Sequence, residues 1–298
     1  MFTNLSLRSR ASSVAVLVLF SLLVYLAPVF EKYGSTLAAL GGSSNQYLTV
    51  TFLDIGQGDA ILIETPDGVQ LLIDGGPDAS VLRELAATMP WFDRTLDMVL
   101  GTHPDKDHIG GLVDVLERYQ VGAIITTENT GETITAKAYH DALQDEGASV
   151  TMARAGAVYQ LGASTTLAVF SPASDPSMLE SNTASIVTQL RYGDIAFMLT
   201  GDAPQSIEQY LVTAYGDQLA SEVLKLGHHG SKTSSAEEFL AAVHPQYAVV
   251  SSSKDNSYGH PATETVARVS VLQIPLINTA ESGRVTFQTD GVTVWQVD

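Results

Sequence analysis

The chain of 298 residues contains no cysteine. This absence excludes disulfide bonds, thiolate zinc sites and cysteine nucleophiles together. A metal site in this protein must therefore be built from histidine, aspartate and glutamate side chains.

Positive charge is also scarce. The sequence has 15 Lys and Arg against 33 Asp and Glu, which gives a formal net charge of -18. This balance argues against a general attraction to polyphosphate, so a nucleic-acid substrate would have to be held locally. With 45% hydrophobic and only 16% charged residues, the composition excludes disorder and fibres and predicts a folded protein.

Long hydrophobic runs are limited to one, Val14–Phe30, near the N-terminus. With the residues before it, this run reaches the roughly 20 residues that a membrane-spanning helix needs. We expect an uncleaved anchor; a cleavable signal peptide, favoured by small residues such as Ala38, and a buried core helix are the alternatives. The positive-inside rule puts Arg8 and Arg10 in the cytoplasm and the rest of the protein outside it, at the cytoplasmic membrane or secreted.

The remainder of the sequence predicts one α/β domain. We expect an anchor over residues 1–34, a linker over 35–46 and a folded domain over 47–298. The domain opens with three predicted antiparallel strands, at Tyr47–Ile55, Ala60–Thr65 and Val69–Asp74. Further strands are predicted at Asp97–Gly101, Ala123–Thr126, Ile186–Tyr192, Ile195–Thr200 and Tyr247–Ser251. Helical periodicity is present at Ala79–Met89, Ile109–Tyr119, Ala136–Glu146, Pro204–Tyr215, Ala236–Val243 and Ala262–Leu272. This alternation suggests two sheets packed face to face and covered by helices.

The stretch between residues 101 and 111 is the most informative. It contains His103, Asp105, Asp107 and His108 within six residues, on a predicted turn between a strand and a helix. Side chains so close together can converge on one point and bind a metal ion. The alternative is a polar loop in which one of the aspartates caps the helix.

Three later stretches also place His or Asp directly after predicted strands. They contain Asp202, the adjacent pair His228 and His229, and His260. In a layered α/β protein such loops can lie along one edge, where binding residues collect. His140 and His244 are expected to lie outside the site, because one falls inside a helical pattern and the other precedes a proline in a turn.

These motifs resemble the metallo-β-lactamase superfamily, and within it the C-terminal domain of the ComEC/Rec2 type of DNA-uptake (competence) proteins. The resemblance rests, in chain order, on Phe52–Asp59, Leu72–Gly76, His103–His108, Asn182–Ser185, Thr200–Asp202, His228–Thr233 and Asn256–Pro261. Such proteins also carry a multi-helix channel, whereas this sequence has one apolar segment. The resemblance therefore implies a tethered hydrolase domain and does not imply transport.

The resemblance implies a four-layer αββα sandwich with two divalent metal ions. One ion would be bound by His103 and Asp105. The other would be bound by Asp107, His108 and His260, with Asp202 bridging both.

The chain departs from the usual superfamily pattern at two positions. Asp105 stands where a histidine is usual, and Asn182–Ser185 occupies the place of the usual third ligand of the first ion. His229 or His228 could complete that ion's site, or the ion could bind there weakly. A carboxylate in place of an imidazole favours Mn²⁺ or Mg²⁺ beside Zn²⁺.

Residues around the expected metal ligands have candidate roles of their own. Asp54, Asp59 and Asp74 are expected to orient ligand histidines, although turn chemistry explains Asp54 and Asp59 equally well. Asp107, His228 and His229 are the candidate catalytic residues. His228 would donate a proton to the leaving oxygen if His229 is a ligand, and these two roles could be exchanged. Candidates for binding the substrate are Ser231, Lys232, Thr233, Asn182 and Asn256.

A membrane-tethered, extracytoplasmic metal-dependent phosphodiesterase or nuclease is the leading hypothesis, with single-stranded DNA or another phosphodiester as its substrate. A hydrolase of a lactone, β-lactam or thioester is the second, because the same chemistry attacks carbonyls. A tethered binding protein without activity is the third. A nuclease would need local positive charge, for which Lys225, Lys232 and Lys254 are the obvious sources. The sequence indicates no protein partner.

Overall fold

The computed structural model describes residues 46–297. The expected anchor, and all but the last residue of the expected linker, lie outside these residues. Within the described part of the chain, no helix combines the length and the apolar character that crossing a bilayer requires.

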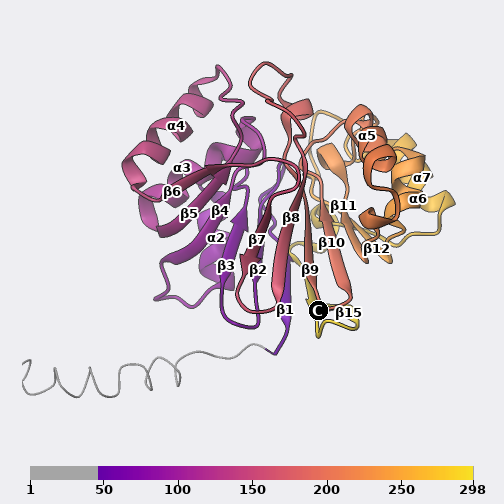
Figure 1. Cartoon of the computed structure of the whole chain (residues 1–298), viewed down its shortest axis with the longest axis horizontal. Helices are drawn as coiled ribbons and strands as arrows, with labels where there is room; N and C mark the ends of the chain where they lie inside the picture. The colour runs from indigo at the N-terminus through magenta and orange to yellow at the C-terminus, as the bar shows by residue number, and fades with distance from the viewer. Residues whose placement is uncertain (1–45, 298) are drawn as a thin grey trace, which may run out of the picture. The chain divides into compact units, whose positions relative to one another are not determined.

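Two β-sheets form the centre of the domain (Figure 1). The first sheet has the strand order β15-β14-β1-β2-β3-β4-β5-β6. Its strands are β1 (Leu48–Phe52), β2 (Ile61–Glu64), β3 (Gln70–Ile73), β4 (Thr95–Leu100), β5 (Gln120–Thr126), β6 (Ser149–Met152), β14 (Val285–Thr289) and β15 (Val294–Val297). Strands β1 to β3 pair antiparallel, which confirms the predicted meander. From β3 to β6 the pairing is parallel.

The second sheet has the order β13-β12-β11-β10-β9-β8-β7. Its strands are β7 (Val158–Leu161), β8 (Thr165–Ser171), β9 (Val187–Tyr192), β10 (Ile195–Leu199), β11 (Val223–Lys225), β12 (Tyr247–Val250) and β13 (Leu276–Asn278). Strands β9 and β10 form the hairpin that the sequence predicts, with Tyr192 opposite Ile195. Strands β10 to β13 are parallel.

Helices cover the outer face of each sheet (Figure 1). The first sheet is covered by α2 (Ser80–Thr88), α3 (Lys106–Arg118) and α4 (Ile134–Glu146), and the second by α5 (Gln205–Tyr215), α6 (Glu237–Val243) and α7 (Thr263–Val271). The shorter helical segments are α8 (Thr279–Ser282), η1 (Asn182–Ala184), η2 (Gly216–Leu219) and η3 (Gly227–Gly230).

Alternating side chains explain this layering. In β2, Ile61 and Ile63 join the core between the sheets, whereas Leu62 joins the core beneath the helices. Because both faces of the central strands are buried, most of their side chains are apolar, and burial of these side chains is the main stabilising contribution. The result is an αββα sandwich, as the sequence motifs implied.

Several parallel strands direct the chain to one end of the domain. The loop after β4 of the first sheet meets the loops after β10 and β11 of the second, because side chains from the two sets lie within 4 Å of one another. The loop after β12 reaches the first sheet at Ser253 N, which donates to Gln57 Oε1 after β1. All the motifs with candidate metal ligands fall in these loops or in the helix turn that follows. The sequence expectation that strand ends would gather them at one edge is confirmed.

Glycines allow the first turns of α3 to pack directly on the loop after β3. Gly75 N donates to His108 O at 2.7 Å, and Gly111 N donates to Gly76 O at 2.9 Å. A Cβ atom on Gly75 would lie 2.7 Å from Leu112 N, and one on Gly111 would overlap the carbonyl oxygen of Gly75. Backbone contact therefore fixes the height of His108 above the sheet.

We predict that Gly111→Ala lowers the free energy of unfolding by about 1–3 kcal/mol, because the new methyl group must displace backbone atoms. Helix propensity alone predicts the opposite sign, a gain of about 1 kcal/mol. Urea unfolding followed by circular dichroism measures the change. A variant at least as stable as the wild type would contradict the packing described here.

Glu208 of α5 fixes the start of α6. Its two carboxylate oxygens accept hydrogen bonds from the backbone N–H groups of Ser235 and Ala236, both at 2.7 Å. The residue is fully buried, and burial outweighs these bonds and raises the pKa of Glu208 to about 7. Gln205, on the same helix, donates to the carbonyl oxygens of Lys232 and Ser234. Helix α5 thus holds the segment that follows η3.

The raised pKa of Glu208 predicts that the protein loses stability as the pH rises. The folded protein keeps this proton to a higher pH than the unfolded chain, so the stabilisation is present below the ordinary pKa of 4.5 and lost as the pH rises through about 7. A shift of this size corresponds to about 3 kcal/mol. Urea unfolding of wild type and Glu208→Gln between pH 4 and 8 should give a difference that changes over this window. Exposed Glu237→Gln is the control, and a pH-independent difference for Glu208→Gln would show the assignment to be wrong.

Candidate metal centre

The turn between β4 and α3 carries four of the predicted ligands. The helix begins at Lys106, earlier than the predicted Ile109, because the backbone oxygen of Asp105 already accepts from His108 N at 3.0 Å. Asp107 therefore lies in the first helical turn, and Asp105 is the residue before the helix. Asp105 makes no side-chain capping bond. Its Oδ1 accepts instead from Ser181 Oγ at 2.6 Å.

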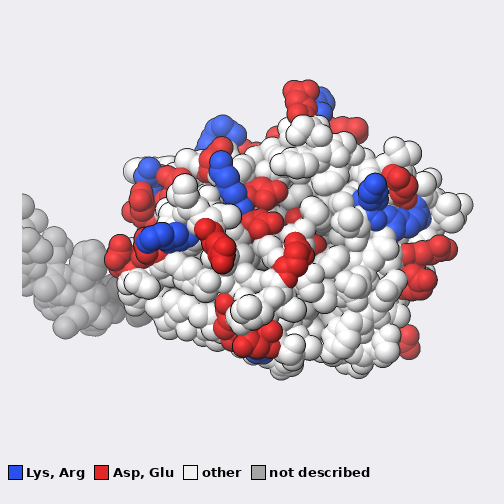
Figure 2. Space-filling model, turned by 90° about the horizontal axis from the view of Figure 1, so that it is seen from above, with Lys and Arg blue, Asp and Glu red and all other residues white. Residues whose placement is uncertain are grey.

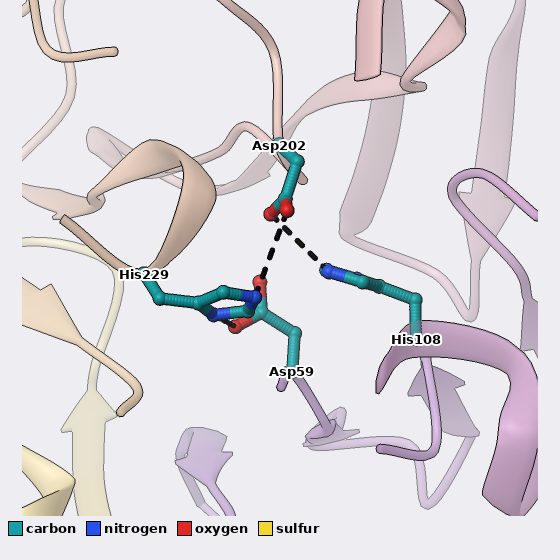
Figure 3. A group of neighbouring side chains, drawn as sticks. All are labelled: Asp59, His108, Asp202 and His229. Carbon is teal, nitrogen blue, oxygen red and sulfur yellow. Dashed lines mark ion pairs between the residues drawn. The ribbon is translucent and has the colours of Figure 1, made fainter. Parts of the chain in front are cut away.

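Asp202 follows β10, and Figure 3 shows its carboxylate directed at His108 and His229. Its Oδ1 is 3.2 Å from His108 Nε2. Its Oδ2 lies 3.6 Å, 3.8 Å and 3.9 Å from the Nε2 atoms of His229, His228 and His103, respectively. Four histidines from two segments, the β4–α3 turn and η3, thus converge on one buried carboxylate.

The four histidines form two groups around Asp202. In the first, His103 Nε2 faces Asp105 Oδ2 at 3.8 Å, and His228 adds its Nε2. In the second, His229 Nε2 faces Asp107 Oδ2 at 3.2 Å, and His108 adds its Nε2.

The backbone of η3 is strained where it presents two of these histidines. His228 and His229 have φ values of 49° and 53°, and Gly230 follows at 78°. Left-handed conformations are costly for residues other than glycine and persist only where the surroundings enforce them. Two in succession at a convergence of ligands indicate a functional constraint.

The Nδ1 atoms of the buried histidines are held by neighbours. The pairs are His103 with Thr102 Oγ1 at 3.0 Å, His108 with Asp74 Oδ2 at 2.8 Å and His229 with Ser251 O at 3.1 Å. Partners of this kind orient ligand histidines in metal sites. They leave each Nε2 directed at the centre.

These inward atoms fit a metal ion. Among the described residues, the Nε2 atoms of His103, His108 and His229 and the Oδ1 atom of Asp202 have no hydrogen-bond partner, although all are buried. Polar atoms buried without partners are costly. Atoms about 2.1 Å from a tetrahedral ion lie about 3.4 Å apart, close to the 3.2–3.9 Å separations around Asp202. Asp59, His108, Asp202 and His229 each offer one ligand atom within 4.8 Å of the others.

Asp74 is the best connected of the three aspartates expected to orient ligands. It has a φ of 57°, and its Oδ1 accepts from Thr102 N at 2.8 Å. Its Oδ2 accepts from Thr102 Oγ1 at 2.7 Å and faces His108 Nδ1. One carboxylate therefore fixes both the loop that carries His103 and the ring of His108.

Asp59 is buried against a lysine. Its Oδ1 lies 2.8 Å from Lys225 Nζ and 3.3 Å from His229 Nδ1. Lys225 is fully buried and also donates to Leu226 O. This contact removes Lys225 from the surface charges that could attract a substrate. The signal in the sequence was a lysine inside the apolar run from 223 to 226, which needs a buried acid.

Charge compensation dominates the electrostatics. Burial alone would raise the pKa of Asp202, but the positive charges of His108 and His229 hold it well below its usual value. Burial opposes charge on these histidines too, yet the carboxylates raise the pKa of His108 well above its usual value and that of His229 to about 9. Burial and nearby His108 lower the pKa of His103. A divalent cation can take the place of such protons.

His228 is the more exposed member of its pair, with 28% of its side chain accessible. Its Nδ1 lies 3.3 Å from Asn182 Nδ2 and 3.3 Å from Thr233 Oγ1, and Thr233 also contacts Ser231. Four of the sequence candidates thus lie together beside the exposed edge of His228, and these four residues define the opening of the site.

His260 lies beside the cluster. Its ring centroid is 5.5 Å from that of His228 and 6.4 Å from that of His229. Within residues 46–297 it makes no ion pair with a carboxylate, so His229 occupies the place beside Asp107 that the sequence motifs gave to His260. Asn256 binds the backbone of His260 in both directions and supports the loop.

Some expectations fall outside the cluster. Asp54 is half-buried after β1 and makes no hydrogen bond or ion pair with a site residue among residues 46–297. Lys232 is exposed, and its backbone oxygen accepts from Gln205 and Arg268. His140 lies on α4 and lines a small cavity together with His103, whereas His244 ends α6, and neither forms an ion pair with a carboxylate among residues 46–297.

The αββα sandwich with a buried His and Asp centre at the strand ends defines a class of metal-dependent hydrolases. Residues 53–254 match the family model of the metallo-beta-lactamase superfamily, and the chain belongs to that superfamily.

Two curated relatives are competence proteins. The chain is 28% identical over 262 residues to ComE operon protein 3 of Bacillus subtilis, covering 80% of this chain and 33% of the relative. It is 32% identical over 239 residues to competence protein ComA of Neisseria gonorrhoeae, covering 80% and 32%. The chain thus spans about a third of the length of these relatives.

Solved structures show the same fold. Zn(2+)-bound PqqB from Methylobacterium extorquens has a TM-score of 0.52 and 13% identity, covering 77% of this chain and 87% of that one. The α/β metallo-β-lactamase fold implied by the sequence motifs is confirmed for the described domain.

We predict that Asp74→Asn weakens metal binding by about 10- to 100-fold, the usual cost of removing a partner of a ligand histidine. The amide oxygen can still accept from Thr102 N, but the amide N–H₂ cannot accept from His108 Nδ1. Calorimetric titration with Mn²⁺ and Zn²⁺ measures the change. Asp141→Asn, an exposed change on α4, is the control, and equal affinities of the Asp74 variant and wild type would refute the role of Asp74.

Proposed function

We propose that the protein is a phosphodiesterase that uses two divalent metal ions to cleave single-stranded DNA. The observation that carries this proposal is the buried carboxylate of Asp202 between two groups of histidine and aspartate side chains. One carboxylate with two such groups is the arrangement expected of a bridging ligand.

In this proposal the two groups bind one ion each. His103 and Asp105 would hold the first, with His228 nearby, and Asp107, His108 and His229 would hold the second. When bound, the ions supply Lewis acidity and a nucleophile from water at neutral pH. The carboxylate at position 105, in place of the usual histidine, favours Mn²⁺ or Mg²⁺ beside Zn²⁺.

Residues at the opening would hold the phosphodiester. Thr233 and Ser231 offer hydroxyl groups next to His228, and the Oδ1 of Asn182 is buried without a partner among the described residues. His228 is exposed enough to reach substrate, and its Nε2 lies 3.8 Å from Asp202 Oδ2, so we assign it the protonation of the leaving oxygen. His260 lies next to it and lines the same opening.

The acidic surface limits how DNA could be attracted. Figure 2 views the molecule from above and shows Lys and Arg scattered among Asp and Glu, without a continuous basic tract on this face. Attraction must come from bound cations and from exposed lysines such as Lys232 and Lys254. The competence proteins among the relatives support DNA as the substrate.

We further propose that residues 14–30 anchor the enzyme in the cytoplasmic membrane with its domain outside. The apolar run behind Arg8 and Arg10 supports this orientation. A tether would keep the hydrolase where incoming DNA is handled, which agrees with its relation to competence proteins.

We predict that Asp202→Asn in the detergent-purified full chain reduces Mn²⁺-dependent cleavage of single-stranded DNA about 100-fold or more. The reason is that a lost ligand must cost at least as much as a lost partner of a ligand. A labelled oligonucleotide resolved on a denaturing gel measures the rate, and Asp194→Asn, in the exposed β9–β10 turn, is the matched control. If wild type cleaves no DNA with Mn²⁺, Mg²⁺ or Zn²⁺ but opens lactones, the proposed substrate is wrong.

A further inference from the structure

Tyr258 is an exposed aromatic residue beside the metal centre. It lies in the loop between β12 and α7, and 71% of its surface is accessible. Its ring stacks on that of His260, with centroids 5.7 Å apart and planes inclined by 24°. One face of the tyrosine is therefore covered by a histidine, and the other is open to solvent.

The loop holds this ring in place. Asn256 Nδ2 donates to Ser253 O and His260 O, both at 2.6 Å, and its Oδ1 accepts from His260 N at 2.9 Å. These bonds close the segment 253–260 into a compact turn. Ser253 N donates to Gln57 Oε1, which ties the turn to the loop after β1. An exposed ring that is already fixed loses little entropy when a ligand binds to it.

Tyr258 is also close to the histidines of the metal centre, because His260 lies between it and His228. His260 lies 5.5 Å from His228 and 6.4 Å from His229, measured between ring centroids. The rings of Tyr258, His260 and His228 thus form a row of neighbours that extends from solvent to the histidines around Asp202.

We propose that the free face of Tyr258 is a stacking subsite for a nucleobase next to the phosphodiester at the metal centre. The proposal rests on the proposed function and adds to it that the enzyme holds an unpaired base. Stacking suits this acidic protein because every base has an apolar face, and an aromatic side chain binds it without positive charge. A base within a duplex is already stacked, so the subsite selects single strands.

The test measures binding and cleavage separately. Binding of a fluorescent, non-cleavable single-stranded oligonucleotide to the Mn²⁺-loaded full chain, followed by anisotropy, should be weakened about tenfold by Tyr258→Ala. Tyr258→Phe keeps the ring and should bind like wild type. Phe92→Ala, which removes another exposed aromatic ring before β4, is the matched control and should change nothing.

An abasic substrate identifies the contact. With the loaded enzyme, Tyr258→Ala should raise the KM for the oligonucleotide about tenfold and leave kcat near the wild-type value. Removing the base adjacent to the cleaved phosphate should cost wild type the same factor and cost Tyr258→Ala nothing more. A general structural defect would instead lower kcat and add to the loss of the base.

Equal binding of the oligonucleotide by wild type and Tyr258→Ala would overturn the stacking subsite, as would an undiminished penalty for the abasic substrate in that variant. Neither result would contradict the proposed nuclease activity as long as wild type cleaves DNA. Absence of cleavage by wild type with every metal would remove the proposed function, whereas the binding comparison would still decide the role of Tyr258.

Discussion

The buried carboxylate of Asp202 is the constraint on which the rest of the site depends. An isolated charge in a protein interior is very unfavourable unless opposite charges or hydrogen bonds compensate it. The fold meets this requirement with four histidine Nε2 atoms within 3.9 Å. Each of the buried histidines then needs a partner for its other nitrogen, which Asp74, Thr102 and Ser251 provide. Ion pairs and hydrogen bonds that start at one carboxylate thus connect five strand ends.

The same requirement explains why the backbone is unusual at several of these ends. Asp74, His228 and His229 have left-handed conformations, and Gly75 and Gly111 bring two segments into backbone contact. Such features cost free energy locally and are maintained by the two sheets and their helices beneath. The rigid sandwich therefore serves to hold strained loops in register, which is what a metal centre with fixed geometry needs.

Part of this arrangement could be predicted from the sequence. The first meander, the β9–β10 hairpin and the gathering of motifs at strand ends follow from local patterns, because alternation and turn residues act over a few positions. The pairing of β1 with β14 joins residues more than 230 positions apart and leaves no local signal. The short edge strands β6 and β7 expose most of their residues, so they also lack the buried apolar pattern that predicts a strand.

Within the site, spacing identified the residues but not their neighbours. His229 and His260 both follow strands, and only the left-handed turn of η3 decides that His229 faces Asp107. The sequence also suggests Lys225 as a surface charge, because a lysine near a loop is usually solvated. The apolar run from 223 to 226 signals that Lys225 is buried, but the identity of its partner, Asp59, depends on a contact between the two sheets that no local pattern encodes.

That burial changes what the net charge of -18 means for the substrate. With Lys225 neutralised internally, the protein has fewer cations to release counterions from a nucleic acid, so affinity for phosphates must depend on bound metal. Contacts that do not depend on salt become correspondingly important, and stacking on Tyr258 is of that kind. An acidic enzyme of this kind would bind its substrate only when metal is present and an unpaired base can reach Tyr258. The low positive charge is thus compatible with a DNA substrate and favours selection for single strands.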